Sequence, residues 1–158
     1  MAITKIIADS ITSGAVANTP AFEATITTEQ NPSSGSYTKI NFDSEIFDTN
    51  NTYDTSNKRF TPGVAGKYFV YCNACMGSNS NSTLANAYLA TYKNGSLLKN
   101  AFYMATTNYT RYQPMTVGNI IDLDADDYVE MYARLVIQSG TVEIRTAESF
   151  FGAYRILT

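Results

Sequence analysis

Few residues in this sequence could do chemistry, and histidine is absent from all 158 positions. Without imidazole the chain lacks a base that titrates near neutral pH, a histidine-based triad and a histidine ligand for zinc. Cys72 and Cys75 have the C-x-x-C spacing of redox pairs and of half a zinc site. No second ligand pair accompanies them, and positions i and i+3 of a strand point to opposite faces. We therefore expect two structural thiols packed as small hydrophobic groups.

Acidic residues cluster between positions 122 and 130. On a strand, Asp122, Asp124 and Asp126 would share one face, where their oxygens could converge on calcium, which prefers oxygen ligands. The cluster lacks the glycine and terminal glutamate of a dedicated calcium loop, so the alternative is a solvated turn. Catalysis on a glycan would need an acid–base pair of carboxylates at a set separation. Because no motif sets one, we expect no enzyme, and a glycan hydrolase is the least favoured function.

The composition excludes other classes of function. Only 16% of the residues are charged, the net charge is −3, and no cluster of Lys and Arg could neutralise several phosphates, so we expect no nucleic-acid partner. The first residues lack the basic and apolar regions of a secretory signal, and no apolar run is long enough to span a bilayer. We therefore expect no membrane insertion. A surface rich in Thr, Asn, Ser and Tyr instead suits weak contacts with glycans.

The elements that must position these residues are strands. Alternation of polar and apolar residues and turn signals between short segments predict an all-β fold. The clearest alternation runs from Tyr128, with Val129, Met131, Ala133 and Leu135 inward. Asn94-Gly95 and Ser139-Gly140 predict hairpin turns, and residues 66–75 form the most apolar run, apolar on both faces. The predicted strands cover residues 21–27, 37–42, 66–75, 87–92, 97–104, 115–123, 128–136, 141–146 and 150–156, whereas residues 48–59 should turn repeatedly.

Several short motifs, in order along the chain, resemble the signature of the C1q domain. The family's segment that leads into a central strand is matched by Tyr53-Asp54, Phe60-Thr61, Val64-Ala65-Gly66 and Tyr68-Phe69. The family's other motifs are matched by Phe22, Phe42-Asp43, Lys93-Asn94-Gly95, Asp127-x-Val129 and Phe150-x-Gly152. The resemblance covers about residues 20–156. Lys58 and Asp126 stand where the family usually has glycine, and both departures fall in turns.

The resemblance implies a ten-stranded antiparallel jelly roll of the tumour-necrosis-factor type that forms a homotrimer around an apolar axis. The aromatic content agrees, because 12 Tyr and 8 Phe exceed what one small sandwich usually encloses. We expect the following residues at the trimer interface: Tyr68, Tyr71, Tyr128, Tyr132, Phe151 and Tyr154. Some members bind calcium near the axis, which keeps Asp122, Asp124 and Asp126 as candidates.

Residues 1–19 stand apart from the domain at 20–158. Their apolar residues, Ile3, Ile6, Ile7 and Ile11, fit neither a clean strand nor a long helix, so the segment is either a lead-in packed on the domain or an arm that docks on another protein. Its Thr, Ser and Ala content resembles the openings of tailed-phage structural proteins. We therefore expect a capsid decoration or short fibre on the virion surface, made in the host cytoplasm and attached by this arm to a capsid or other virion protein.

Two alternatives to that function remain open. One is a receptor-binding adhesin that recognises host surface glycans through loops 77–83 and 106–113. The other is a secreted C1q-like lectin or signalling module. Binding to a glycan array that is lost on loop substitution would favour the adhesin.

Overall fold

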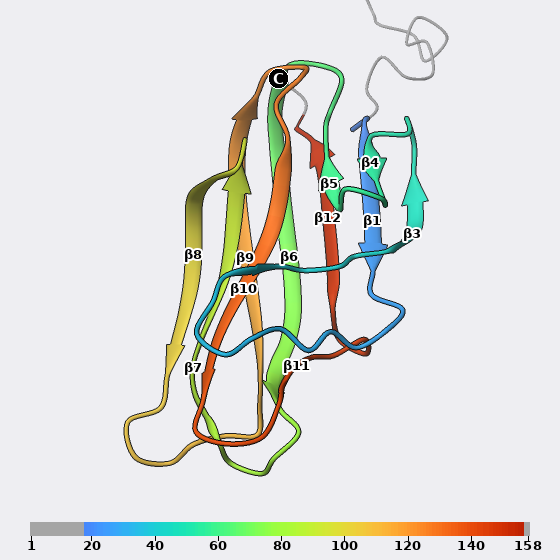
Figure 1. The fold of residues 1–158 in the computed structure, drawn as a ribbon. Coiled ribbons are helices and arrows are strands. Elements are labelled where there is room, and N and C mark those ends of the chain that lie inside the picture. Colours follow the sequence, from blue (N-terminus) through green and yellow to red (C-terminus); the bar gives the residue numbers. More distant parts are fainter. Residues whose placement is uncertain (1–17, 157–158) are drawn as a thin grey trace, which may run out of the picture.

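The computed structural model describes residues 18–156 as two antiparallel sheets of six strands each, packed face to face (Figure 1). The first sheet, sheet A, contains β1 (Ala21–Thr25), β3 (Ser44–Asp48), β6 (Gly66–Ser78), β9 (Tyr112–Leu123), β11 (Val142–Ile144) and β12 (Phe150–Arg155). The second, sheet B, contains β2 (Thr38–Lys39), β4 (Tyr53–Asp54), β5 (Arg59–Phe60), β7 (Leu84–Lys93), β8 (Ser96–Met104) and β10 (Val129–Ile137). The described part of the chain contains no helix, so none there could cross a membrane.

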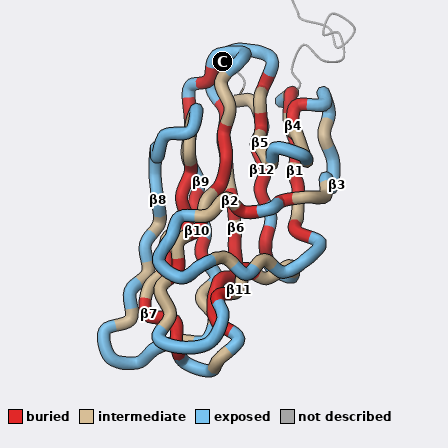
Figure 2. Tube along the Cα trace, viewed as in Figure 1, coloured by how far each residue is buried: buried red, intermediate tan, exposed pale blue. Residues whose placement is uncertain are grey.

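Sheet A is built around β6, which pairs with β9 along one edge and with β12 and β11 along the other. β1 pairs with β12, and β3 pairs with β1 at the far side of the sheet. In sheet B, β10 has β7 on one edge and the short strands β2 and β5 on the other. Among the described strands β8 pairs only with β7, and it is exposed along most of its length (Figure 2).

The two sheets enclose one core because the long strands β6, β7, β9 and β10 bury the side chains of one face. On β6 the buried set is Tyr68, Val70, Cys72, Ala74 and Met76, and on β10 it is Val129, Met131, Ala133 and Leu135. The centre is aromatic. The Phe22 ring stacks on Tyr53 and on Phe60 at centroid distances of 4.6 and 4.8 Å. These contacts join β1 of sheet A to β4 and β5 of sheet B.

The predicted all-β sandwich is confirmed, with differences in the short strands. Residues 37–42 contribute only two residues to a sheet, because Thr38 and Lys39 alone pair with β10. Residues 48–59, expected to turn repeatedly, instead hold the end of β3, all of β4 and the start of β5. β6 extends three residues beyond the predicted run and ends at Ser78. Residues 18–156 therefore contain twelve strands, where the resemblance implied ten.

Both cysteines are free and buried, as expected. Cys72 lies inward among the core residues, and its pKa is well above the usual value because burial disfavours the thiolate. Cys75 lies three positions later, and its pKa is also raised, chiefly by burial. The C-x-x-C spacing in this chain thus follows from packing, and the two thiols form no disulfide.

Candidate functional site

The outer face of sheet A carries apolar side chains that no part of the described chain covers. We call this surface the aromatic face and define it by Phe69, Tyr71, Ile120, Phe150 and Tyr154. The first three lie on β6 and β9, and the last two on β12. Ile120 is 67% exposed, and Phe150 and Tyr154 are each 37% exposed. Phe69 is paired with Ile120 of β9 on one side and with Tyr154 of β12 on the other, so these three residues form one row across the sheet.

The aromatic rings contact one another rather than standing alone. The centroids of Phe69 and Tyr71 are 5.8 Å apart, those of Phe69 and Tyr154 are 5.6 Å apart, and those of Tyr71 and Phe150 are 6.2 Å apart. Aromatic pairs in this distance range add stability beyond the area they bury. The aromatic face is therefore an ordered surface within a single chain.

Two glycines make room for these rings. Gly118 and Gly152 flank Tyr71 in the sheet, one on β9 and the other on β12. A Cβ atom on Gly152 would lie 2.4 Å from the Tyr71 Oη, and one on Gly118 would lie 3.2 Å from the Phe69 Cζ. The missing side chains let the rings lie across the neighbouring strands.

Tyr71 crosses β12 to reach β1. Its hydroxyl donates a hydrogen bond of 2.8 Å to the Glu23 carboxylate, and Glu23 is opposite Gly152 in the sheet. The pKa of Tyr71 is raised, first by burial and then by this hydrogen bond and the negative charge of Glu23. The neutral phenol is thus held in place as a donor, and it fixes one end of the aromatic face.

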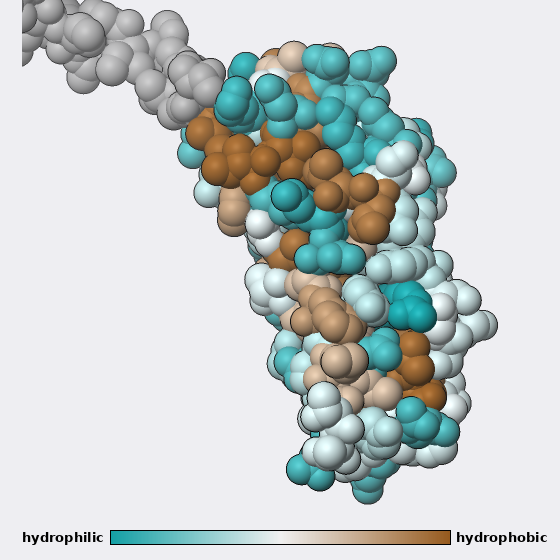
Figure 3. Space-filling model, turned by 90° about the vertical axis from the view of Figure 1, so that its left-hand side faces the viewer, coloured by the Kyte–Doolittle hydropathy of each residue, from teal (hydrophilic) through white to brown (hydrophobic). Residues whose placement is uncertain are grey.

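A second apolar surface lies at the edge of the sandwich where β8 and β9 run side by side. Leu97 is 50% exposed and Leu98 is 40% exposed, and Ile120 extends the aromatic face to this edge. A hollow of about 500 Å³ separates the two strands and is lined by Leu98 and Ile120 together with Lys93, Lys99, Gly118, Asn119, Ile121 and Asp122. Figure 3 shows apolar surface gathered in a band across the upper half of this side of the molecule.

Two of the six predicted interface residues are not on the surface. Tyr68 and Phe151 are 0% exposed and belong to the core, where Tyr68 contacts Phe60 and Phe151 contacts Phe22. Their assignment to an interface is wrong, because a fully enclosed side chain cannot contact a second folded chain. The inward positions of β6 and β12 require large side chains, since sheet A must fill the space up to sheet B.

The other four predicted residues fall on two opposite surfaces. Tyr71 and Tyr154 belong to the aromatic face of sheet A, whereas Tyr132 and Tyr128 lie on or just before β10 of sheet B. Tyr132 packs against Tyr92 with centroids 4.2 Å apart, and the Arg59 guanidinium lies over the Tyr128 ring. The sequence pattern did not single out Phe69, Ile120 and Phe150 as interface residues, although the apolar outer face of β6 indicated Phe69.

The three calcium candidates do not form a site within one chain. No group of three His, Cys, Asp or Glu side chains between residues 18 and 156 is placed to hold a metal ion. Asp122 instead lies 3.7 Å from the Lys67 ammonium, while Asp124 and Asp126 fall in the exposed turn after β9. The expectation that these three aspartates share one strand face is wrong, because the strand ends at Leu123 and only Asp122 lies on it. A calcium site near the axis of a trimer stays a prediction.

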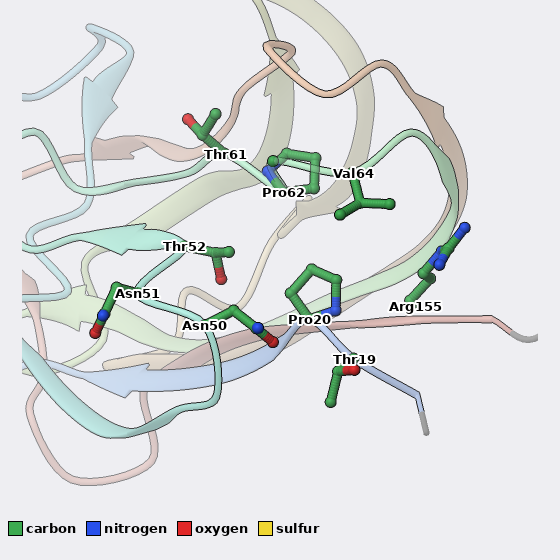
Figure 4. Close-up of a pocket in the computed structure, with 10 residues that line it drawn as sticks. Thr19, Pro20, Asn50, Asn51, Thr52, Thr61, Pro62, Val64 and Arg155 are labelled. Atoms are coloured by element: carbon green, nitrogen blue, oxygen red, sulfur yellow. The ribbon is translucent and has the colours of Figure 1, made fainter. Parts of the chain in front are cut away.

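The end of the sandwich where β1 begins and β12 ends contains an open hollow of about 450 Å³ (Figure 4). Pro20 and Asn50 lie on one side of it, with Pro62 and Val64 across from them. Among residues 18–156, Arg155 is the one ionisable residue that lines it, so the described lining contains no carboxylate pair for acid–base chemistry. The predicted anchoring residues, Ile3, Ile6, Ile7 and Ile11, lie outside the described residues.

The comparison with protein families gives a match that spans most of the chain. The model of the C1q domain matches residues 21–156. The chain belongs to the C1q domain family. This membership confirms the resemblance read from the short motifs and the jelly-roll class of the fold.

The C1q domain resembles known proteins of two kinds. Among solved structures, the globular domain of zebrafish complement 1qA superimposes with a TM-score of 0.63 at 15% identity, over 87% of this chain and 97% of that one. Among curated proteins, the phage-like element PBSX protein XkdV of Bacillus subtilis (strain 168) is 32% identical over 104 residues. That match covers 62% of this chain and 15% of the relative, so the chain spans a small part of the relative's length.

The structure explains why two family motifs far apart in the sequence occur together. The Lys93-Asn94-Gly95 hairpin and Asp127 meet at one end of the C1q domain. The Asp127 carboxylate accepts hydrogen bonds from Asn94 Nδ2 at 2.6 Å and from the Asp124 backbone N–H at 2.7 Å, and it forms a 2.7 Å ion pair with Lys93. These contacts lower the pKa of Asp127 to about 2, with the Lys93 hydrogen bond as the largest cause. The motifs therefore tie the β7–β8 hairpin to the turn between β9 and β10.

Proposed function

We propose that the chain is a trimeric binding head of a bacteriophage-type particle, a capsid decoration or a short fibre. The observation that carries the trimer is the aromatic face, which one chain builds in order and leaves open to solvent. Contiguous apolar patches of this kind mark sites of protein association. Domains of the C1q family form trimers, which supports a second and third copy of this chain as the partners.

The two apolar surfaces suit a closed ring of three chains. The aromatic face lies on the outside of sheet A, and the edge formed by β8 and β9 lies beside it with Leu97 and Leu98 exposed. If the edge of one chain packs on the aromatic face of the next, the contact is heterologous, and such contacts form rings when the rotation closes. Ile120 belongs to both surfaces, so it would lie where adjacent contacts meet.

The assignment to a phage particle is supported by the relative that is named a phage-like element protein. In this proposal residues 1–19, with Ile3, Ile6, Ile7 and Ile11, attach the trimer to a capsid or other virion protein. The described chain begins and ends at one end of the sandwich, and loops 79–83 and 105–111 lie at the opposite end (Figure 1). Attachment through residues 1–19 would thus leave those loops facing outward on the virion surface.

The head acts by binding rather than by turnover. Three carboxylates within residues 18–156 have a shifted pKa, and in each the pKa is lowered: Asp43, Asp54 and Asp127. A general acid at neutral pH requires a raised pKa instead. Three copies on one axis would multiply weak contacts by raising the effective concentration of each binding surface.

An adhesin is the second candidate, because the outward loops are joined into one surface. The backbone N–H of Ser78 donates to Arg111 O, and that of Leu84 donates to Thr110 O. These bonds hold the ends of loop 79–83 against the end of loop 105–111, so the two segments could contact one receptor together.

Light scattering after gel filtration tests the trimer through a matched pair of tyrosines. Tyr154 and Tyr37 are both 37% exposed, but Tyr154 lies on β12 of sheet A, whereas the Tyr37 ring packs against Tyr88 and Tyr92 of sheet B. We expect three times the 17.4 kDa of one chain for the unmodified protein and for Tyr37→Asp. Tyr154→Asp should give the mass of one chain, because a carboxylate would be buried unpaired in the contact. A single-chain mass for the unmodified protein would refute the trimer.

A further inference from the structure

The outer face of sheet B carries a second group of aromatic side chains, which the trimer described above leaves open. We call this group the tyrosine platform and define it by Tyr37, Tyr88, Tyr92, Phe102 and Tyr132. Tyr88 and Tyr92 lie on β7, Phe102 on β8 and Tyr132 on β10, while Tyr37 directly precedes β2. Ala90, opposite Tyr132 in the sheet, is completely buried beneath the group.

The rings of the tyrosine platform pack against one another. Tyr88 stacks on Phe102 with centroids 4.4 Å apart, and the Arg134 guanidinium lies 5.3 Å from the Tyr88 centroid. These three residues are opposite one another on β8, β7 and β10, so they form one row. The centroid of the Tyr37 ring lies 6.0 Å from that of Tyr88 and 6.2 Å from that of Tyr92, and the Tyr37 ring is inclined to both. Burial raises the pKa of Tyr92, which agrees with this packing.

Ring surface and polar groups are exposed side by side on the tyrosine platform. Phe102 is 51% exposed and Tyr37 is 37% exposed, so both offer apolar ring surface to a ligand. The exposed Asn100 lies in the neighbouring row, opposite Ala90. Sugars are recognised by this combination, because a pyranose ring has an apolar face for an aromatic ring and hydroxyl groups for amide and phenol partners.

The charges beside the tyrosine platform favour an acidic ligand. The Lys39 ammonium is neutralised by the buried Glu130 carboxylate. Arg134 donates its Nε hydrogen to Gly35 O and takes part in no salt bridge within residues 18–156. Its terminal guanidinium nitrogens thus keep a positive charge available at the edge of the rings, in the fork geometry that suits a carboxylate.

We propose that the tyrosine platform binds an acidic polysaccharide chain, with sugar rings on Tyr37 and Phe102 and a sugar carboxylate on Arg134. The proposal deepens the binding function proposed above by naming the ligand class. It does not depend on the trimer, because each chain contains a whole tyrosine platform.

Calorimetric titration of the full chain with a hexamer of galacturonic acid tests the proposal, with maltohexaose as the neutral probe. We expect the unmodified protein to bind the acidic hexamer. Tyr37→Ala should weaken this binding about tenfold, because one aromatic contact with a sugar ring is lost. Phe47→Ala is the control, because it removes an exposed aromatic side chain from β3 of the other sheet, outside the aromatic face. Its affinity for the hexamer should be unchanged. Arg134→Gln should weaken the acidic hexamer and leave maltohexaose unaffected.

Four outcomes would overturn the proposal. The first is no binding of the acidic hexamer, and the second is equal binding of the acidic and neutral hexamers by the unmodified protein. The third is stronger binding of oligo-dT than of the hexamer, which would identify single-stranded nucleic acid as the ligand. The fourth is a change in native mass caused by Tyr37→Ala, which would identify another copy of this chain as the occupant.

Discussion

The close approach of Tyr71 to Gly152 predicts the effect of a single methyl group on sheet A. In Gly152→Ala the new Cβ would lie 2.4 Å from Tyr71 Oη, 2.5 Å from its Cζ and 2.9 Å from the backbone oxygen of Phe22. Real contacts of this kind are longer, so the Tyr71 ring must move. The Phe22 oxygen belongs to the backbone of β1 and cannot move without disturbing the sheet.

The cost has two parts. Moving the ring breaks the 2.8 Å hydrogen bond from Tyr71 to the Glu23 carboxylate and loosens the contacts with Phe69 and Phe150. Overpacking of well-packed sites typically costs about 1–3 kcal/mol, and we expect roughly 2 kcal/mol for Gly152→Ala. For a domain of this size the loss corresponds to a fall of about 4–8 °C in the melting temperature.

Thermal unfolding at one fixed protein concentration measures the effect, and a second background isolates its cause. In Tyr71→Ala the ring is gone, so adding Gly152→Ala should cost much less, with a coupling of about 1–2 kcal/mol between the two sites. Equal costs in the two backgrounds would refute the role of the ring. They would place the strain at the Phe22 oxygen instead.

Two further predictions concern other parts of the chain. Asp127→Asn should lower the melting temperature at pH 7. The pKa of Asp127 in the folded protein is about 2, below its ordinary value of 3.8, so the carboxylate stabilises the fold until it is protonated. The difference in melting temperature from the unmodified protein should therefore disappear as the pH falls from about 4 towards 2. The same difference at pH 2.5 as at pH 7 would show that the charge on Asp127 is not the cause. The Cys72 and Cys75 thiols should not react with a thiol reagent at pH 8 in the native protein and should react in urea, because both are buried and both have a raised pKa. Rapid labelling of Cys72 without denaturant would contradict the packing of β6.

The sequence predicted the sandwich because alternation is a local signal. Along β10 each inward residue from Val129 to Leu135 is buried, as its period of two required. The short strands between residues 44 and 60 were missed for the same reason, since they have two to five residues and their pairing depends on β1 and β10. A pair of residues is too short to show a period.

The trimer-interface residues could be predicted only in part. Both faces of β6 are apolar, so its sequence does not reveal which face meets sheet B. Tyr68 and Tyr71 differ by three positions and point to opposite sides, and the choice between them follows from the partner strands alone. Phe151 was misplaced in the same way, because its neighbour Phe150 is equally apolar and faces outward.

Other parts of the surface become apparent only through strand register. Tyr37, Tyr88 and Tyr132 are distant in sequence, and their meeting depends on β10 pairing with β2 on one edge and β7 on the other. Gly118 and Gly152 likewise gain their meaning from lying on either side of Tyr71. Long-range pairing of this kind leaves no periodic trace in the sequence.

Hydroxyl-radical footprinting of the unmodified protein tests most directly whether sister chains cover the outer side of sheet A. Tyr154 and Tyr37 have the same exposed fraction, 37%, in a single chain, so a monomer would label both at similar rates. Assembly through the aromatic face predicts that Tyr154 is protected while Tyr37 is labelled, and that dilution to single chains restores the labelling of Tyr154. Equal labelling of the two tyrosines in the undiluted protein would contradict the account.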